Sequence, residues 1–127
     1  NADEWVSIIP GTEGILALGI ANIIVSEGFS QRGAELSSVL RDYPIDKVSE
    51  ATGVPTDTIR QIAQDFSSMQ PSLAIGGGTA MTGTNATETQ VAINILNYVS
   101  GNIGETIDFA HTLSISDASP FSEMLSL

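Results

Sequence analysis

The spacing of apolar residues along this chain predicts several helices, one of them almost entirely apolar. Residues 15–25 contain a single strongly polar side chain, and they follow Pro10-Gly11. Thr12 is suited to the N-cap, Glu13 to the first turn, and Gly28 to the end of this helix. A helix with so little polar face is expected to be buried on most sides.

Shorter patterns predict further helices. Residues 36–40 and residues 45–52 favour two short ones, the second closed by Gly53. Pro55 fits the first turn of another helix, which ends before Pro71. Its apolar residues follow the i, i+3, i+4, i+7 spacing of one buried stripe, at Ile59, Ile62, Ala63 and Phe66. A last helix is expected over residues 86–99, ended by the turn at Gly101.

Three short apolar runs are typical of strands: residues 5–9, 72–75 and 106–109. The second leads directly into Gly76-Gly77-Gly78, and a helix follows. This order of helix, strand, glycine loop and helix is typical of a doubly wound parallel sheet. We therefore predict an α/β fold, a Rossmann-like layered domain with a short parallel sheet flanked by helices. Too few strands are present for a complete sheet, so we expect it to be part of a larger fold.

Composition narrows the classes of partner. The chain has 127 residues, 42% of them hydrophobic, and a formal net charge of −11. Such a charge opposes binding to nucleic acid and to anionic membrane surfaces. The chain has no cysteine, which excludes disulfides and thiolate metal sites within it. No apolar run reaches the roughly 20 residues of a membrane span, so we expect no direct membrane insertion.

The first candidate site is Gly11-Thr12-Glu13, at the start of the apolar helix. Unpaired N–H groups and the positive end of the helix dipole point out of such a turn. The carboxylate of Glu13 can accept from two adjacent donors, such as the N1–H and the exocyclic amine of guanine. The alternative is an ordinary capped helix start, in which Glu13 only complements the dipole.

The second candidate site is the glycine loop at Gly76, Gly77 and Gly78. Ligands of open α/β sheets bind beyond the carboxyl ends of the strands, where glycines leave room and expose backbone donors. The dinucleotide fingerprint is only partly met, because Met81 stands at its third glycine position. A tight turn without a ligand is the alternative. The sequence offers no catalytic residue and no metal site, and the lone His111 is expected to be a surface or packing residue.

Taken in order, seven segments of this chain resemble one stretch of the molybdopterin oxidoreductases, the superfamily of dimethyl sulfoxide reductase and formate dehydrogenase. They are Ala-Asp-Glu-Trp (2–5), Ile-Pro-Gly-Thr-Glu-Gly (9–14), Leu-Ala-Leu (16–18), Thr-Gly-Val-Pro (52–55), the helix with Ile59, Ile62 and Ala63, Pro-Ser-Leu-Ala-Ile-Gly-Gly-Gly (71–78) and Ala-Ile-Asn-Ile-Leu-Asn-Tyr-Val-Ser-Gly-Asn-Ile-Gly (92–104). The resemblance implies that residues 1–104 are a fragment of the domain that cradles molybdopterin guanine dinucleotide. Residues 105–127 form a serine-rich tail that the resemblance does not cover.

The resemblance also implies roles for both candidate sites. The family's Pro-Gly-Thr-Asp turn is associated with the guanine end of the cofactor, and Glu13 stands here in place of the aspartate. Gly11 and Thr12 match, and Gly76, Gly77 and Gly78 match a loop near the cofactor. The metal ligand and the iron–sulfur cysteines belong to preceding segments of the family. Molybdenum or tungsten would therefore be held only by the full-length protein, and none is expected on the isolated chain.

Three functions remain open from the sequence. The first is a cofactor-binding fragment of an oxidoreductase, with the remaining domains of the parent polypeptide and iron–sulfur electron-transfer subunits as partners. The second is a cofactor-free structural domain of a respiratory-complex subunit from the same superfamily. The third is the central domain of a thiamine-diphosphate enzyme, which does not account for residues 10–13. The cellular compartment, cytoplasmic or periplasmic, is open too, as is the choice between a soluble protein and one peripheral to a membrane complex.

Overall fold

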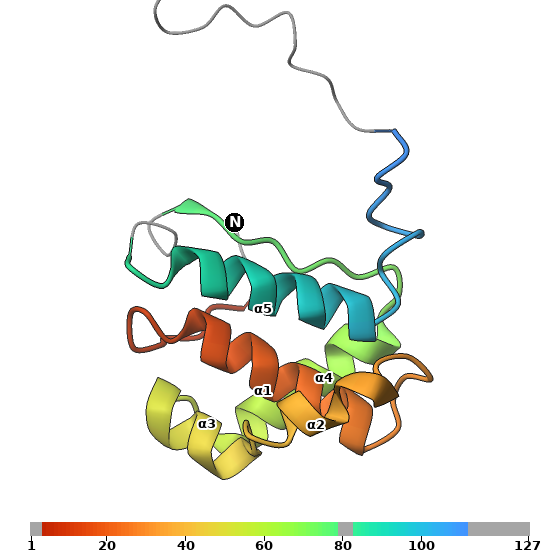
Figure 1. Ribbon diagram of the computed structural model, residues 1–127. Helices are drawn as coiled ribbons and strands as arrows, with labels where there is room; N and C mark the ends of the chain where they lie inside the picture. Colours follow the sequence, from red (N-terminus) through yellow and green to blue (C-terminus); the bar gives the residue numbers. More distant parts are fainter. Residues whose placement is uncertain (1–3, 79–82, 112–127) are drawn as a thin grey trace, which may run out of the picture.

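The computed structural model describes residues 4–78 and 83–111, and the secondary structure of this part is helical. The elements are α1 (Glu13–Ser26), the 3-10 turn η1 (Ala34–Leu36), α2 (Ser37–Leu40), α3 (Ile45–Thr52), α4 (Thr56–Ser68) and α5 (Ala86–Val99). Figure 1 shows α5 lying alongside α1, with α2, α3 and α4 grouped on the other side of α1. Helix α1 is therefore the centre of the assembly, and it contacts each of the other helices.

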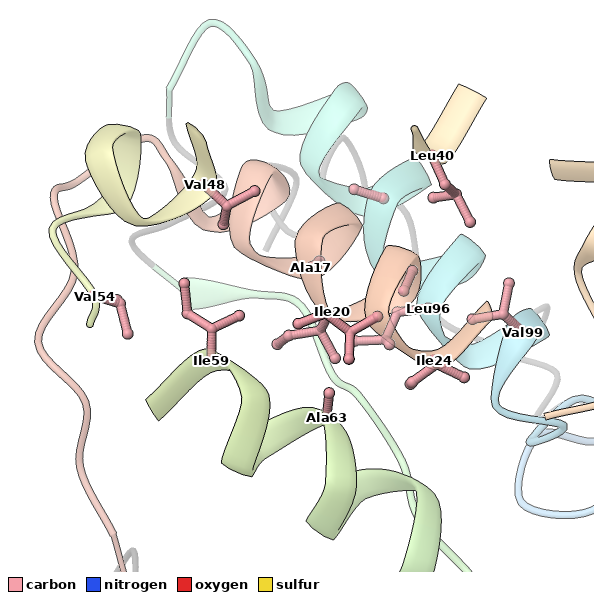
Figure 2. Packing of buried hydrophobic residues seen from close by; sticks show 13 residues of the cluster. Ala17, Ile20, Ile24, Leu40, Val48, Val54, Ile59, Ala63, Leu96 and Val99 are labelled. Atoms are coloured by element: carbon pink, nitrogen blue, oxygen red, sulfur yellow. The ribbon is translucent and has the colours of Figure 1, made fainter. Parts of the chain in front are cut away.

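The hydrophobic core forms where these helices meet α1. Figure 2 shows Ala17, Ile20 and Ile24 of α1 among side chains from α3, α4 and α5. The buried apolar residues of the other elements include Leu40, Val48, Val54, Ile59, Ala63, Ala92, Leu96 and Val99. The expectation that the apolar helix is buried on most sides is confirmed, and other helices of the same chain provide the cover.

Two glycines allow α1 to approach its neighbours closely. A Cβ atom on Gly19 would lie 2.7 Å from Val48 Cγ2 of α3. A Cβ atom on Gly14 would lie 3.1 Å from the Cα atom of Thr89 in α5. Gly19 leaves room for the Val48 side chain, and Gly14 leaves room for the backbone of Thr89, because glycine has no side chain. The glycines thus fix how near α3 and α5 lie to the central helix.

The predicted α/β fold is wrong: the described residues contain five α-helices and no strand. The expected strands at residues 5–9 and 72–75 run extended but pair with no strand in the described part of the chain. Only Ile9 makes backbone–backbone hydrogen bonds there, with Thr12 and with Thr52 at the end of α3. Residues 106–109 lie in turns next to an isolated bridge between Ile103 and Ile107. Apolar alternation favours an extended backbone, but a strand also needs a neighbouring strand to accept its hydrogen bonds.

Side chains of α5 and of the turn after it take the place of such a neighbour for residues 72–75. Asn97 and Asn102 are both buried, and each hydrogen bonds to this extended segment, at Ala74 and Ser72 respectively. Side chains along the segment alternate in exposure: Leu73 and Ile75 are exposed, and Ala74 between them is half-buried. The segment therefore keeps the side-chain pattern of a strand without belonging to a sheet.

Candidate functional site

The turn before α1 is held by its own backbone and by Thr12. Gly11 has φ +87°, a conformation that favours glycine, and a Cβ atom there would meet no atom within 4 Å. Thr12 occupies the N-cap position, as the sequence predicts, but its hydroxyl makes no capping bond to the helix. It donates instead to the Ile9 carbonyl oxygen at 2.6 Å. The N–H groups of the first turn of α1 are thus left without a side-chain cap.

Glu13 is the first residue of α1 and is half-buried. Its Oε2 atom is buried and has no hydrogen-bond partner among the described residues. A buried polar atom without a partner is costly, by about 1–3 kcal/mol and more for a charged group. This oxygen is therefore an acceptor that a donor from outside the described residues could satisfy.

The start of α5 lies against the same turn. The side-chain Nδ2 of Asn85 donates to the Gly11 carbonyl oxygen at 2.7 Å. Asn85 is the N-cap residue of α5, and it too makes no capping bond to its own helix. Figure 1 shows α1 and α5 beginning at the same end of the molecule and running in the same direction. The positive ends of two helix dipoles therefore meet at this end, an arrangement that favours an anionic ligand.

The glycine loop reaches this same end of the molecule in Figure 1, although its three glycines have different surroundings. A Cβ atom on Gly76 would lie 2.6 Å from Ile93 Cδ1 and 2.7 Å from Gln90 Oε1, so this glycine packs closely against the ends of two α5 side chains. Gly77 and Gly78 have φ +152° and +64°, and a Cβ atom on either would meet nothing within 4 Å. Backbone at Gly77 and Gly78 is accessible to a ligand, whereas Met81 lies outside the described residues.

A small cleft of about 110 Å³ lies beside the contact between the N-terminal halves of α1 and α5. It is lined by Gly14, Ile15, Leu18, Tyr43, Asn85, Glu88, Thr89 and Ala92. Thr89 is 1% exposed, and its Oγ1 atom has no hydrogen-bond partner within the described part of the chain. Sequence reasoning missed both Asn85 and Thr89, because only the folded chain brings the start of α5 to the Gly11 turn.

The two helix starts carry hydrogen-bonding groups. No group of three or more His, Asp or Glu side chains within residues 4–78 and 83–111 could hold a metal ion. His111 is exposed and contacts Asp108, and its ring holds the pKa of the Asp108 carboxyl below its usual value. None of the described helices is long and apolar enough to cross a membrane. The chemistry available at the two helix starts is recognition by N–H donors and by one carboxylate acceptor.

Comparison with known proteins gives several partial matches, and no family model matches the chain. The molybdopterin-binding-like subunit of menaquinone reductase from Nitratidesulfovibrio vulgaris is 30% identical over 81% of this chain and 15% of its own length. Dimethyl sulfoxide reductase DmsA of Escherichia coli is 25% identical over 80% of this chain and 16% of its own length.

A solved structure agrees with these sequence matches. Acetylene hydratase from Pelobacter acetylenicus superposes with a TM-score of 0.72 and 28% identity, over 80% of this chain and 15% of that protein. The chain thus spans about 15% of the length of the relatives named here. Sequence and fold together make this chain a distant homologue of the molybdopterin oxidoreductases, matched over a small part of their length.

Proposed function

We propose that this chain is part of the cofactor-holding region of a molybdopterin-dependent oxidoreductase and contributes to binding the guanine dinucleotide end. The observation that carries the proposal is the buried, unpartnered Oε2 of Glu13 at the uncapped start of α1. A carboxylate in this place accepts hydrogen bonds and gives none when ionised. The N1–H and the exocyclic amine of guanine are adjacent donors of matching spacing.

Each residue of the turn has a separate role in this proposal. Glu13 would accept from guanine, while the open backbone at Gly11 would let the ligand come close. The hydroxyl oxygen of Thr12 is already a donor to Ile9, so it would serve the ligand only as an acceptor. Gly77 and Gly78 would offer backbone N–H groups, and Gly76 would keep their loop close to α5.

The net charge of −11 shapes how such an anionic cofactor would be held. The turn and its neighbours contribute no Lys or Arg, so backbone N–H groups and helix dipoles would stabilise the phosphates. When bound to the full-length protein, the molybdenum or tungsten cofactor supplies the two-electron chemistry, with transfer of an oxygen atom or a hydride equivalent. This chain's own part is limited to binding and orienting.

The proposal is tested in the full-length protein by replacing Glu13. We expect Glu13→Ala to lower both bound metal, measured by mass spectrometry, and guanine nucleotide released by acid. Glu13→Gln keeps the size of the side chain but places an amide N–H donor beside the guanine donors. It should therefore also lower the content of metal and of guanine nucleotide. Asp57→Ala, which removes the first-turn carboxylate of α4, is the matched control. Unchanged metal and nucleotide content in both Glu13 variants would refute the guanine role.

A second function is favoured by one relative. The menaquinone reductase subunit, 30% identical to this chain, is named only as molybdopterin-binding-like. The chain would then belong to a structural subunit of a respiratory complex, and this subunit would carry no cofactor. Residues 10–13 would then only begin the helix and would bind no ligand. Purified full-length protein that assembles with its partner subunits but contains neither metal nor guanine nucleotide would establish this alternative over the first.

The isolated chain should show only weak binding. The chain provides only one edge of the proposed cofactor site, and its charge of −11 opposes anionic ligands. We therefore expect a dissociation constant for guanosine diphosphate above the micromolar range, and no bound molybdenum. Titration calorimetry measures the first and metal analysis the second. A submicromolar dissociation constant would contradict the view that this region is one part of a larger site.

A further inference from the structure

A second hollow lies away from the helix starts, beside α4. It is an open groove of about 350 Å³, and we call it the α4 groove. Its lining residues come from the chain before α1, from α4 and its end, and from the extended segment at 72–73: Glu4, Ile62, Asp65, Phe66, Met69, Ser72 and Leu73. None of them belongs to the proposed cofactor site.

The floor of the α4 groove is apolar and partly open to solvent. Met69 is 63% exposed and Leu73 is 41% exposed, while Ile62 and Phe66 are half-buried and pack against the core. Apolar side chains that gather in one hollow, rather than lying singly on the surface, are typical of interaction sites. Methionine adds a flexible, polarizable side chain that adapts to the shape of a partner.

The charged side chains of the groove are both carboxylates. Glu4 is exposed, and Asp65 is half-buried with its Oδ1 accepting from Gln61 Nε2 at 2.9 Å. No Lys or Arg is among the described residues that line the groove, and the whole chain has only 4 basic residues against 15 acidic ones. An occupant of the groove is therefore selected for positive charge as well as for an apolar group.

We propose that the α4 groove is a docking site for a partner polypeptide segment that presents an apolar side chain flanked by Arg or Lys. The apolar side chain would seat on Phe66, Met69 and Leu73, and the basic residues would face Glu4 and Asp65. A second copy of this chain is a poor occupant, because two chains of charge −11 repel each other. Nucleic acid and anionic lipid are disfavoured for the same reason. This proposal does not depend on cofactor binding.

The test uses three fluorescein-labelled dodecapeptides and the folded chain, with binding followed by fluorescence anisotropy. One peptide alternates Arg and Leu, one alternates Arg and Ser, and one alternates Glu and Leu. We expect saturable binding of the Arg-Leu peptide, weaker binding of the Arg-Ser peptide by about tenfold, and none of the Glu-Leu peptide. The single tryptophan, Trp5, follows Glu4 in sequence and gives a second optical signal.

Matched variants separate docking in the groove from general attraction to an acidic protein. Met69→Ser should weaken the Arg-Leu peptide about tenfold, whereas Val39→Ser, at a residue of similar exposure on α2, should not. Glu4→Gln should weaken it about threefold. Glu50→Gln changes the net charge equally from an exposed place on α3 and should leave binding unchanged. Circular dichroism confirms that each variant is folded.

Several results would overturn the proposal. The first is that the Arg-Leu peptide does not bind, and the second is that the Arg-Ser peptide binds as tightly as the Arg-Leu peptide. The third is that Glu4→Gln and Glu50→Gln change the affinity for the Arg-Leu peptide equally. Sedimentation provides a further outcome: a dimer of the chain that Met69→Ser dissociates would assign the groove to a second copy instead.

Discussion

The side-chain amide of Asn97 holds the backbone of Ala74 by two hydrogen bonds. Its Oδ1 accepts from the Ala74 N–H at 2.9 Å, and its Nδ2 donates to the Ala74 carbonyl oxygen at 2.8 Å. Asn102 Nδ2 donates to the same Oδ1 at 3.0 Å, and Ser72 Oγ bonds to Asn102 Oδ1 at 3.1 Å. A helix residue thereby satisfies an extended segment as an adjacent strand would.

Replacing Asn97 should therefore destabilise the whole fold. Asn97→Ala removes three hydrogen bonds and leaves the half-buried backbone of Ala74 and the buried amide of Asn102 without these partners, so we expect a loss of about 3 kcal/mol in the free energy of unfolding. Urea denaturation followed by circular dichroism measures it. Asn94→Ala, at an exposed residue of the same helix, is the control and should change stability by less than about 0.5 kcal/mol.

Two buried threonines should respond oppositely to the same substitution. Thr52 Oγ1 donates to the Val48 carbonyl oxygen at 2.7 Å and accepts from the Val54 N–H at 3.2 Å. Thr52→Val should therefore cost about 1–2 kcal/mol. Thr89 Oγ1 has no partner in the described residues, so Thr89→Val should raise the stability of the isolated chain by about 1 kcal/mol. Equal losses in the two variants would show that the Thr89 hydroxyl is already paired.

The contact between α1 and α3 predicts a rescue. Gly19→Ala would bring its new methyl group to 2.7 Å from Val48 Cγ2, which forces α3 away and should cost about 1–3 kcal/mol. Val48→Ala removes the obstructing methyl groups. The double variant should thus be less destabilised than the sum of the two single variants, as denaturation of all four proteins would reveal. Additive losses would mean that α3 does not rest on Gly19.

The Tyr98 hydroxyl donates to Glu35 Oε1 at 2.6 Å and sets the ionisation of both groups. This bond, with a backbone hydrogen bond, lowers the pKa of Glu35, and the bond to Glu35 raises the pKa of Tyr98. Since the folded pKa of Glu35 lies below its unfolded value, the contribution to stability is present above the unfolded pKa. It is lost as pH falls through the folded one.

Tyr98→Phe should accordingly raise the pKa of Glu35 toward its ordinary value, measured by carbon NMR titration of the carboxyl group. Tyr43→Phe, at the other tyrosine of the chain, is the control and should leave the pKa of Glu35 unchanged. The reciprocal variant Glu35→Gln should lower the pKa of Tyr98, measured by ultraviolet absorbance at high pH. A Glu35 titration curve that is the same with and without Tyr98 would contradict this pairing.

Helices were predictable from the sequence because their determinants are local. The bounds expected for residues 45–52 and 86–99 agree with α3 and α5, and Pro55 stands just before the start of α4. The i, i+3, i+4 spacing reports which face is buried whatever covers it. The covering layer was not predictable in this way. The order of helix, strand, glycine loop and helix suggested a sheet, whereas four other helices surround α1.

The candidate site likewise has features that the sequence predicts and features that depend on the folded chain. The helix start at Thr12 and the open glycines at 77 and 78 follow from residue types, while the packing role of Gly76 depends on Ile93 and Gln90 beneath it. The Thr12 hydroxyl bonds to Ile9 rather than to the helix, a choice that no sequence rule distinguishes. Contact of Asn85 with Gly11 joins residues far apart in the chain, where local patterns carry no information.

That contact between Asn85 and Gly11 spans 74 positions and therefore sets when the paired helix starts can form during folding. Closing so long a loop has an entropic cost that only the packing of α1 on α5 repays, so the two helix starts are assembled together with the core and not before it. A shortened chain that stops before α5 would retain Gly11, Thr12 and Glu13 but would lose the Asn85 contact and the second helix start. The pairing of the two helix starts is in this sense a late product of global folding.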